Sequence, residues 1–126
     1  LISKRPREGV TTDTTRTNFE DLLRESDVIS LHCPLTVDTI GLIGPAELEM
    51  MKSKAILINT ARGALVDSAA LVNALENNVI AAAAIDVLAQ EPPIDNDPIL
   101  FTTLEIIVST SFGIELVAIS LGNNLM

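Results

Sequence analysis

The feature that most constrains the fold is an alternation of short apolar runs with helical patterns along the whole chain. The runs that predict strands are short and rich in aliphatic and β-branched residues; they are residues 1–3, 27–32, 55–58, 79–87 and 105–108. The segments that predict helices are residues 17–25, 44–51, 67–76 and 114–126. Unbroken apolar strands that alternate with helices predict an α/β fold, with a parallel sheet covered by helices on both faces.

Local signals indicate where the helices begin and end. Thr17 and Glu20 have the spacing of a capping box, and Pro45 follows Gly44 as the first residue of a helix. Asp67 is a suitable N-cap, and Asn77-Asn78 suits the exit of the same helix because asparagine tolerates the left-handed conformation. Residues 79–87 are ambiguous because their alanines favour a helix, but their length and place in the alternation favour a strand.

Composition excludes several classes of function. The 126 residues suffice for one domain, and their net charge of -9 opposes binding to nucleic acid. No apolar run reaches the roughly 18 residues of a membrane span. A single cysteine, Cys33, and a single histidine, His32, exclude an internal disulfide and a multi-cysteine or multi-histidine metal site. The acidic run at 95–97 lacks the glycine and glutamate of a calcium loop, so no metal site is expected.

Polar residues follow the predicted strands at the edge where open α/β sheets bind ligands. They include the segments 32–36 and 59–63, the two carboxylates of Asp86 and Glu91, and the segment 109–113. Arg62 precedes a glycine, so its guanidinium can form a fork of hydrogen bonds to a carboxylate while the ligand approaches the backbone. A solvated surface arginine is the other interpretation that this pattern leaves open. The first interpretation predicts a site for a small carboxylate or keto acid.

These segments carry a resemblance to a known family. The blocks SDVISLHCPLT at 26–36 and ILINTARGALVD at 56–67, with Met51-Lys52 and 69–71 in register, resemble the D-isomer-specific 2-hydroxyacid dehydrogenases. The resemblance continues through Asp86 to Glu91 and covers nearly the whole chain. It is closest to the glyoxylate/hydroxypyruvate reductase branch, and it implies a Rossmann-like, doubly wound parallel sheet that binds NAD(P).

The resemblance implies roles for individual residues. Arg62 would be the catalytic arginine that holds the substrate carboxylate and polarises its carbonyl, and Glu91 would orient the catalytic histidine. The positions that match cofactor contacts are Pro34, Thr39, Thr60 and Asp86. Hydride transfer to a ketone builds negative charge on oxygen, which explains why a cation and a proton donor are needed there.

One departure from the family concerns the proton donor. Family members carry Thr-Pro-His or Leu-Pro-His after the last strand, whereas this chain has Ser109-Thr110-Ser111, with Ser111 at the position of the histidine. A serine hydroxyl does not cycle a proton near neutral pH, and loss of a general acid/base costs about 10²–10⁴ in rate. His32 follows a different strand, where the resemblance favours a structural or cofactor-neighbouring role over a catalytic one. We therefore expect impaired catalysis.

A second departure concerns the phosphate-binding turn. The chain has no G-x-G-x-x-G motif, and residues 1–3 match the second strand of the usual 3-2-1-4-5-6 order. The missing first strand would lie between the strands at 1–3 and 27–32. We therefore expect residues 1–126 to form a partial NAD(P)-binding domain, truncated at its N-terminus and without a substrate domain.

The segment after the first predicted strand bears on the choice of cofactor. NAD-preferring members of the family place an acidic residue there to bind the ribose hydroxyls, whereas this chain has Ser3, Lys4 and Arg5. By resemblance, Ser3 and Arg5 would suit a 2′-phosphate, which favours NADP over NAD. The alternative is that Lys4 and Arg5 are solvated loop charges.

The resemblance implies an oxidoreductase that transfers hydride between NAD(P) and a small 2-oxo or 2-hydroxy acid, in a parent family that is commonly a cytoplasmic homodimer. Two alternatives stay open. One is a non-catalytic, degenerate module that binds a nucleotide weakly or pairs with another subunit. The other is that further upstream sequence encodes the glycine-rich turn.

Overall fold

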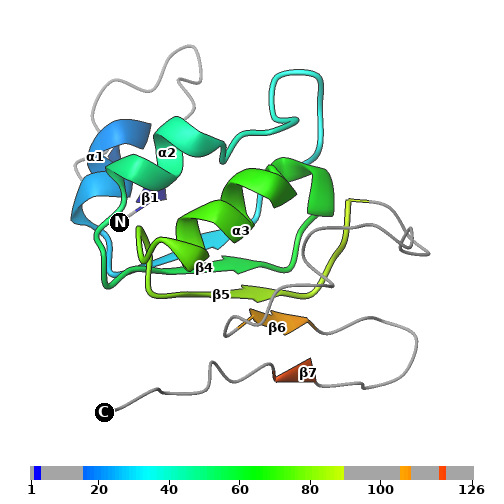
Figure 1. Cartoon of the computed structure of the whole chain (residues 1–126). Helices are drawn as coiled ribbons and strands as arrows, with labels where there is room; N and C mark the ends of the chain where they lie inside the picture. The colour runs from blue at the N-terminus through cyan, green and yellow to red at the C-terminus, as the bar shows by residue number, and fades with distance from the viewer. Residues whose placement is uncertain (1, 4–15, 90–105, 109–116, 119–126) are drawn as a thin grey trace.

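The computed structural model describes residues 2–3, 16–89, 106–108 and 117–118 of the chain. Figure 1 shows helices on one side of a sheet whose strands lie side by side. In chain order the elements are β1 (Ile2–Ser3), β2 (Arg16–Thr17), α1 (Phe19–Glu25), β3 (Val28–Leu31), α2 (Pro45–Met50), β4 (Ile56–Asn59), the 3₁₀ turn η1 (Gly63–Leu65), α3 (Ser68–Glu76), β5 (Ala82–Ile85), β6 (Ile106–Val108) and β7 (Val117–Ala118).

The main sheet has five strands in the order β3-β4-β5-β6-β7. The first four are parallel, with Val28 opposite Ile56 and Ile56 opposite Ala82. This arrangement confirms the predicted α/β, Rossmann-like fold. It also settles the ambiguous segment 79–87, because Ala82–Ile85 lies as a strand between β4 and β6.

The prediction of a helix over residues 114–126 is wrong at Val117–Ala118. These two residues form β7, which pairs antiparallel with Val108 and Ile107 of β6. The remainder of that segment lies outside the described residues. A short apolar run is compatible with the periodicity of a helix and with that of a strand. Here the edge of β6 that faces away from β5 provides hydrogen-bond partners for the backbone of Val117–Ala118, so the run forms a strand.

The described strands form two separate sheets. β1 and β2 pair with each other in parallel, while β3 pairs only with β4 among the described strands. One edge of β3 is therefore without a described partner strand. Among the described strands, this break separates β1 and β2 from the sheet that begins with β3.

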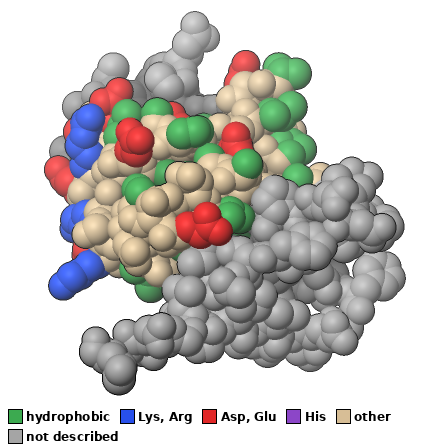
Figure 2. Space-filling view, in the orientation of Figure 1, with side chains coloured by type: hydrophobic (Ala, Val, Ile, Leu, Met, Phe, Trp, Pro, Cys, Tyr) green, Lys and Arg blue, Asp and Glu red, His purple; other side chains and the backbone are tan. Residues whose placement is uncertain are grey.

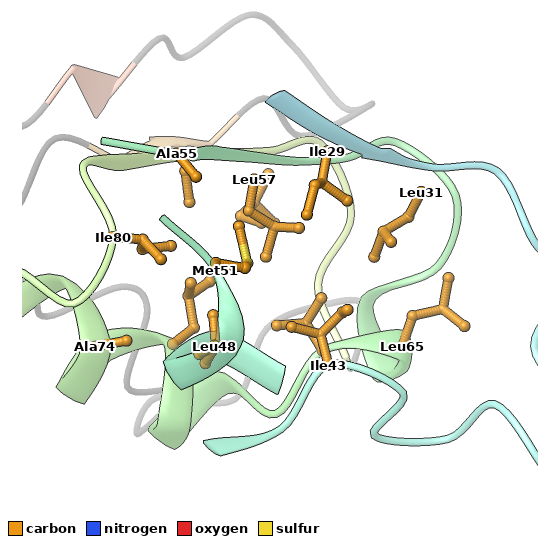
Figure 3. Packing of buried hydrophobic residues seen from close by; sticks show 14 of the residues in the cluster. Ile29, Leu31, Ile43, Leu48, Met51, Ala55, Leu57, Leu65, Ala74 and Ile80 are labelled. Carbon is orange, nitrogen blue, oxygen red and sulfur yellow. The ribbon is translucent and has the colours of Figure 1, made fainter. Parts of the chain in front are cut away.

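The core lies between one face of the sheet and helices α2 and α3. Figure 3 shows Ile29 and Leu57 of the sheet pointing toward Leu48 and Met51, which come from α2 and its C-terminal end. Leu57 and Leu48 are almost completely buried. Burial of such side chains is the main force that holds the helices on this face of the sheet.

The opposite face is more open than the sequence predicts. Val28 and Ile56 point away from the core and are 54% and 37% exposed. The prediction that residues 27–32 and 55–58 are buried on both faces is therefore wrong at these two positions. An apolar run shows that a strand can be covered on both sides, but covering it requires other elements that the run does not specify.

The helix termini follow the predicted signals with one correction. The N-cap of α1 is Asn18 rather than Thr17, and its Oδ1 accepts a hydrogen bond of 2.8 Å from the backbone N of Asp21. Asp67 caps α3 as predicted, through Ala70 N at 3.0 Å. Asn78 has φ 55, the left-handed conformation expected at the helix exit.

None of the described helices is long and apolar enough to cross a membrane.

Candidate functional site

A pocket of about 560 Å³ lies at the carboxyl ends of β3 and β4. One side consists of the residues that follow β3, and the other consists of the residues that follow β4. The lining residues are His32, Cys33, Pro34, Leu35, Thr60, Ala61 and Arg62. Parallel α/β sheets bind their ligands at this edge, so the pocket lies where the fold predicts a site.

The pocket brings together three of the predicted site residues: Pro34, Thr60 and Arg62. Asp86 is at the same edge of the sheet, because its backbone N donates a hydrogen bond of 2.9 Å to the carbonyl oxygen of Asn59. It is not among the described residues that line the pocket. The pocket thus contains Arg62, Thr60 and Pro34, and Asp86 follows the end of the neighbouring strand β5.

Arg62 is the only arginine or lysine among the described residues that line the pocket. Its side chain is exposed, and its Nη1 donates a hydrogen bond of 2.6 Å to the carbonyl oxygen of Ala61. Among the described residues, no carboxylate forms an ion pair with it. Its remaining N–H donors are therefore available to an anionic ligand.

The pocket also contains residues that were predicted at this edge of the sheet but were not assigned as binding residues. Cys33 and Leu35 line it, although neither was singled out as a binding residue. His32 also lines it, and its Nε2 lies 2.8 Å from Oγ of Ser30. These residues directly follow the last position of β3 and belong to the segment 32–36, which the sequence predicts at the ligand-binding edge of the sheet.

Gly63 brings the arginine loop into close contact with the chain that leaves β5. A Cβ atom at this position would lie 1.9 Å from the backbone carbon of Leu88 and 2.2 Å from the backbone N of Ala89. No other residue fits without movement of one of the two backbones. Gly63 therefore allows the loop after β4 and the segment 86–89 to lie against each other.

Thr39 is buried inside the loop after β3, where it is 4% exposed. Its hydroxyl donates a hydrogen bond of 2.8 Å to the carbonyl oxygen of Pro34 and accepts one of 2.7 Å from the backbone N of Thr36. These bonds hold the turn that presents Pro34 to the pocket. The direct cofactor contact implied by the resemblance stays a prediction for Thr39.

We expect Thr39→Val to lower the free energy of unfolding by about 2 kcal/mol, because it removes the two hydrogen bonds by which the buried Thr39 hydroxyl holds the Pro34 carbonyl and the Thr36 N–H. Urea denaturation measures this change. Thr60→Val is the control, since Thr60 is exposed and its hydroxyl has no described partner, and we expect a change within about 0.5 kcal/mol. Equal losses in the two variants would contradict this role of Thr39.

The same loop carries hydrophobic side chains outward. Val37 and Ile40 are 87% and 63% exposed, and Leu35 is exposed as well. Figure 2 shows hydrophobic side chains gathered over this loop between β3 and α2, at the upper right of the view. The loop after β3 therefore exposes apolar side chains, and one of them, Leu35, also lines the pocket.

The other predicted site residues have no described side chain. Ser3 is described only as the end of β1, and Arg5, Glu91 and Ser111 lie outside the described residues. Within the described part of the chain, no group of three or more His, Cys, Asp or Glu side chains could hold a metal ion.

Comparison with known proteins identifies matches over most of the chain. Residues 2–112 match the model of the D-isomer specific 2-hydroxyacid dehydrogenase, NAD binding domain. A glyoxylate reductase of Aeropyrum pernix is 57% identical over 82 residues, which are 65% of this chain and 24% of that protein. The chain spans about a quarter of the length of this and two other curated relatives that it matches.

Solved structures of the same kind match the fold. A glyoxylate reductase from Paecilomyes thermophila gives a TM-score of 0.68 at 38% identity, over 75% of this chain and 28% of that one. A D-lactate dehydrogenase with NAD+ from Lactobacillus jensenii also gives 0.68, at 36% identity, over 81% of this chain and 36% of that one.

Proposed function

The chain belongs to the D-isomer specific 2-hydroxyacid dehydrogenases, as part of their NAD binding domain, and from this premise we propose that its pocket binds a small 2-oxo or 2-hydroxy acid beside a nicotinamide cofactor. The observation that carries the proposal is the placement of Arg62 in a pocket at the carboxyl ends of two parallel strands, without a described carboxylate partner. The relatives named glyoxylate reductase support glyoxylate as a substrate, and the resemblance of the sequence to the glyoxylate/hydroxypyruvate reductase branch adds hydroxypyruvate.

Arg62 has two roles in this proposal. Its guanidinium binds the substrate carboxylate through paired hydrogen bonds, and it directs positive charge toward the carbonyl oxygen, where negative charge develops. Such an interaction is strongest in the transition state, so it lowers the barrier rather than only tightening binding. The nicotinamide supplies the hydride when it is bound.

The residues of this chain fit the nicotinamide end of the cofactor better than its pyrophosphate. Pro34 and Thr60 line the pocket and Asp86 follows the neighbouring strand, so these residues would hold the nicotinamide end. The sequence has no G-x-G-x-x-G turn for the pyrophosphate. We propose that Ser3 and Arg5 favour NADP over NAD, because the segment lacks the acidic residue that binds the ribose hydroxyls.

We propose that catalysis by this chain is impaired. Glu91 would orient a histidine that the sequence replaces with Ser111, and a hydroxyl does not transfer a proton near neutral pH. In the pocket, Nε2 of His32 lies 2.8 Å from Oγ of Ser30, and this contact supports a structural or cofactor-neighbouring role for His32. The parent protein would be a cytoplasmic homodimer, as is common in the family that the sequence resembles.

We expect at most trace oxidation of NADPH or NADH when the purified chain is mixed with glyoxylate or hydroxypyruvate. Absorbance at the nicotinamide band measures this rate, and fluorescence titration with each cofactor measures the preference for NADPH. Turnover within the usual enzymatic range, about 1–10³ s⁻¹, would contradict the impairment while supporting the reaction. Tighter binding of NADH than of NADPH would contradict the proposed preference.

A subunit-pairing module is the second candidate, and the open edge and face of the sheet favour it. β3 has no described partner strand on one side, and Val28 and Ile56 expose apolar surface beside that edge. Unpaired strand edges are templates for pairing with another chain. Light scattering of the purified chain tests this candidate, because a folded monomer at all concentrations would exclude self-pairing.

A further inference from the structure

Asn59 is a fully buried polar residue directly beside the candidate site. It is the last residue of β4, it is 0% exposed, and it follows three aliphatic residues of the strand. A buried amide group is costly unless its donor and its acceptor are both hydrogen-bonded. The reason for an amide at this position must therefore lie in its partners.

Both ends of the Asn59 side chain bind the loop that carries Arg62. Oδ1 accepts a hydrogen bond of 3.1 Å from the backbone N of Ala61, and Nδ2 donates one of 2.9 Å to the carbonyl oxygen of Arg62. The two bonds span the peptide unit that joins these residues. The side chain thus holds the backbone of Arg62 from inside the protein, while the side chain of Arg62 is exposed and lines the pocket.

Two neighbouring contacts fix the same loop from other sides. The carbonyl oxygen of Arg62 also accepts a hydrogen bond of 3.2 Å from the backbone N of Leu65. Gly63 lies against the backbone of Leu88, so the loop has little room to move in that direction. Of these contacts, only the bonds of Asn59 come from a side chain, and they can be altered without changing the loop itself.

We propose that Asn59 is a positioning residue for Arg62, which sets the direction in which the guanidinium enters the pocket. This inference rests on the proposed function, in which Arg62 binds a carboxylate. The chemistry requires asparagine because one group must accept from an N–H and the other must donate to a carbonyl. An aspartate of the same shape accepts but, when ionised, does not donate. A small displacement of a binding group of this kind can cost up to about a hundredfold.

The test measures how well oxamate, which carries a carboxylate beside a carbonyl, protects Arg62 from phenylglyoxal, a reagent that modifies arginine. Mass spectrometry of the full chain measures the rate at Arg62, and Arg24 on α1 is the internal reference because it is exposed and far from the pocket in sequence. We expect Asn59→Asp to raise the oxamate concentration needed for half-protection roughly tenfold. Asn59→Ser places no charge in the core, so it provides a second variant if Asn59→Asp does not fold.

Asn77→Asp is the matched control. The Nδ2 of Asn77 donates a hydrogen bond of 2.8 Å to the carbonyl oxygen of Asn73, so the variant removes the same kind of bond away from the site. We expect unchanged protection of Arg62 in this control. A variant at position 59 that folds and protects Arg62 at the wild-type oxamate concentration would overturn the inference.

A further readout separates this inference from the proposed function. Without any ligand, we expect the ratio of the modification rates of Arg62 and Arg24 to change at least twofold in Asn59→Ser, because the loop loses its support. If oxamate does not protect wild-type Arg62, the proposed carboxylate site is wrong, and the ligand-free ratio alone decides the role of Asn59. An unchanged ratio would then overturn the inference.

Discussion

Gly63→Ala is expected to lower the free energy of unfolding by about 3 kcal/mol or more, the largest loss we expect from a methyl group added at any of the described glycines. The added Cβ would lie 1.9 Å from the backbone carbon of Leu88. Backbone atoms cannot rotate away as the end of a side chain can, so the two loops must separate. Urea denaturation followed by circular dichroism measures the loss.

Gly44→Ala is the control for this prediction. A Cβ at Gly44 would meet Oε2 of Glu47 at 3.3 Å, and that atom is the end of a flexible side chain. We expect a loss of about 1 kcal/mol, which reflects the poor N-capping of alanine. If Gly63→Ala costs no more than Gly44→Ala, the loops after β4 and β5 do not lie in contact in solution.

Gly63→Ala also has a consequence for the site. The substitution moves the loop of Arg62 relative to the segment 86–89, which leads toward Glu91. We therefore expect weaker protection of Arg62 by oxamate even at temperatures where the variant remains folded. A folded variant with wild-type protection would show that the two loops act independently.

Arg62→Gln is expected to weaken oxamate binding about a hundredfold and to change the stability of the fold little. Hydrogen bonds to charged groups contribute about 1.5–3 kcal/mol, and a hundredfold change corresponds to about 2.7 kcal/mol. The exposed Arg62 side chain has one described hydrogen bond, to Ala61, so the free energy of unfolding should change by about 0.5 kcal/mol or less. Titration by NMR, followed at the amide of Ala61, measures binding with and without NADPH.

Two further variants make this prediction specific. Arg62→Lys keeps the charge but loses the planar fork, so we expect an intermediate loss of about tenfold. Arg24→Gln removes a surface arginine whose Nη1 lies 3.3 Å from Oε2 of Glu20 on the same helix, and binding should not change. Wild-type affinity in Arg62→Gln would place the carboxylate site elsewhere and would remove the main support for the proposed reaction.

Local sequence patterns predicted most of the described elements. The strands β3, β4 and β5 and the helices α1, α2 and α3 were all expected, because hydrophobic periodicity and capping act over only a few residues. The pattern was least informative at Val117–Ala118, where an apolar run expected to be a helix pairs with β6 instead. The choice there depends on a partner strand, which lies outside the local window.

The candidate site was predicted in part. Pro34, Thr60 and Arg62 were expected at one edge and line one pocket, since the carboxyl ends of parallel strands meet there. The burial of Thr39 and the bonds of Asn59 were not expected. Both residues are polar and lie beside the site, and only their surroundings show that their side chains bind the backbone of a loop.

The sequence alone determined that this chain forms a parallel α/β sheet, and it placed Arg62 and Gly63 in the segment that follows the predicted strand at 55–58. Only the tertiary structure decided that Gly63 touches the backbone near residue 88 and that Val28 and Ile56 remain exposed. The physical reason is the range of the interactions. Periodicity and capping involve neighbours in the chain, whereas close packing and burial depend on which distant segments meet.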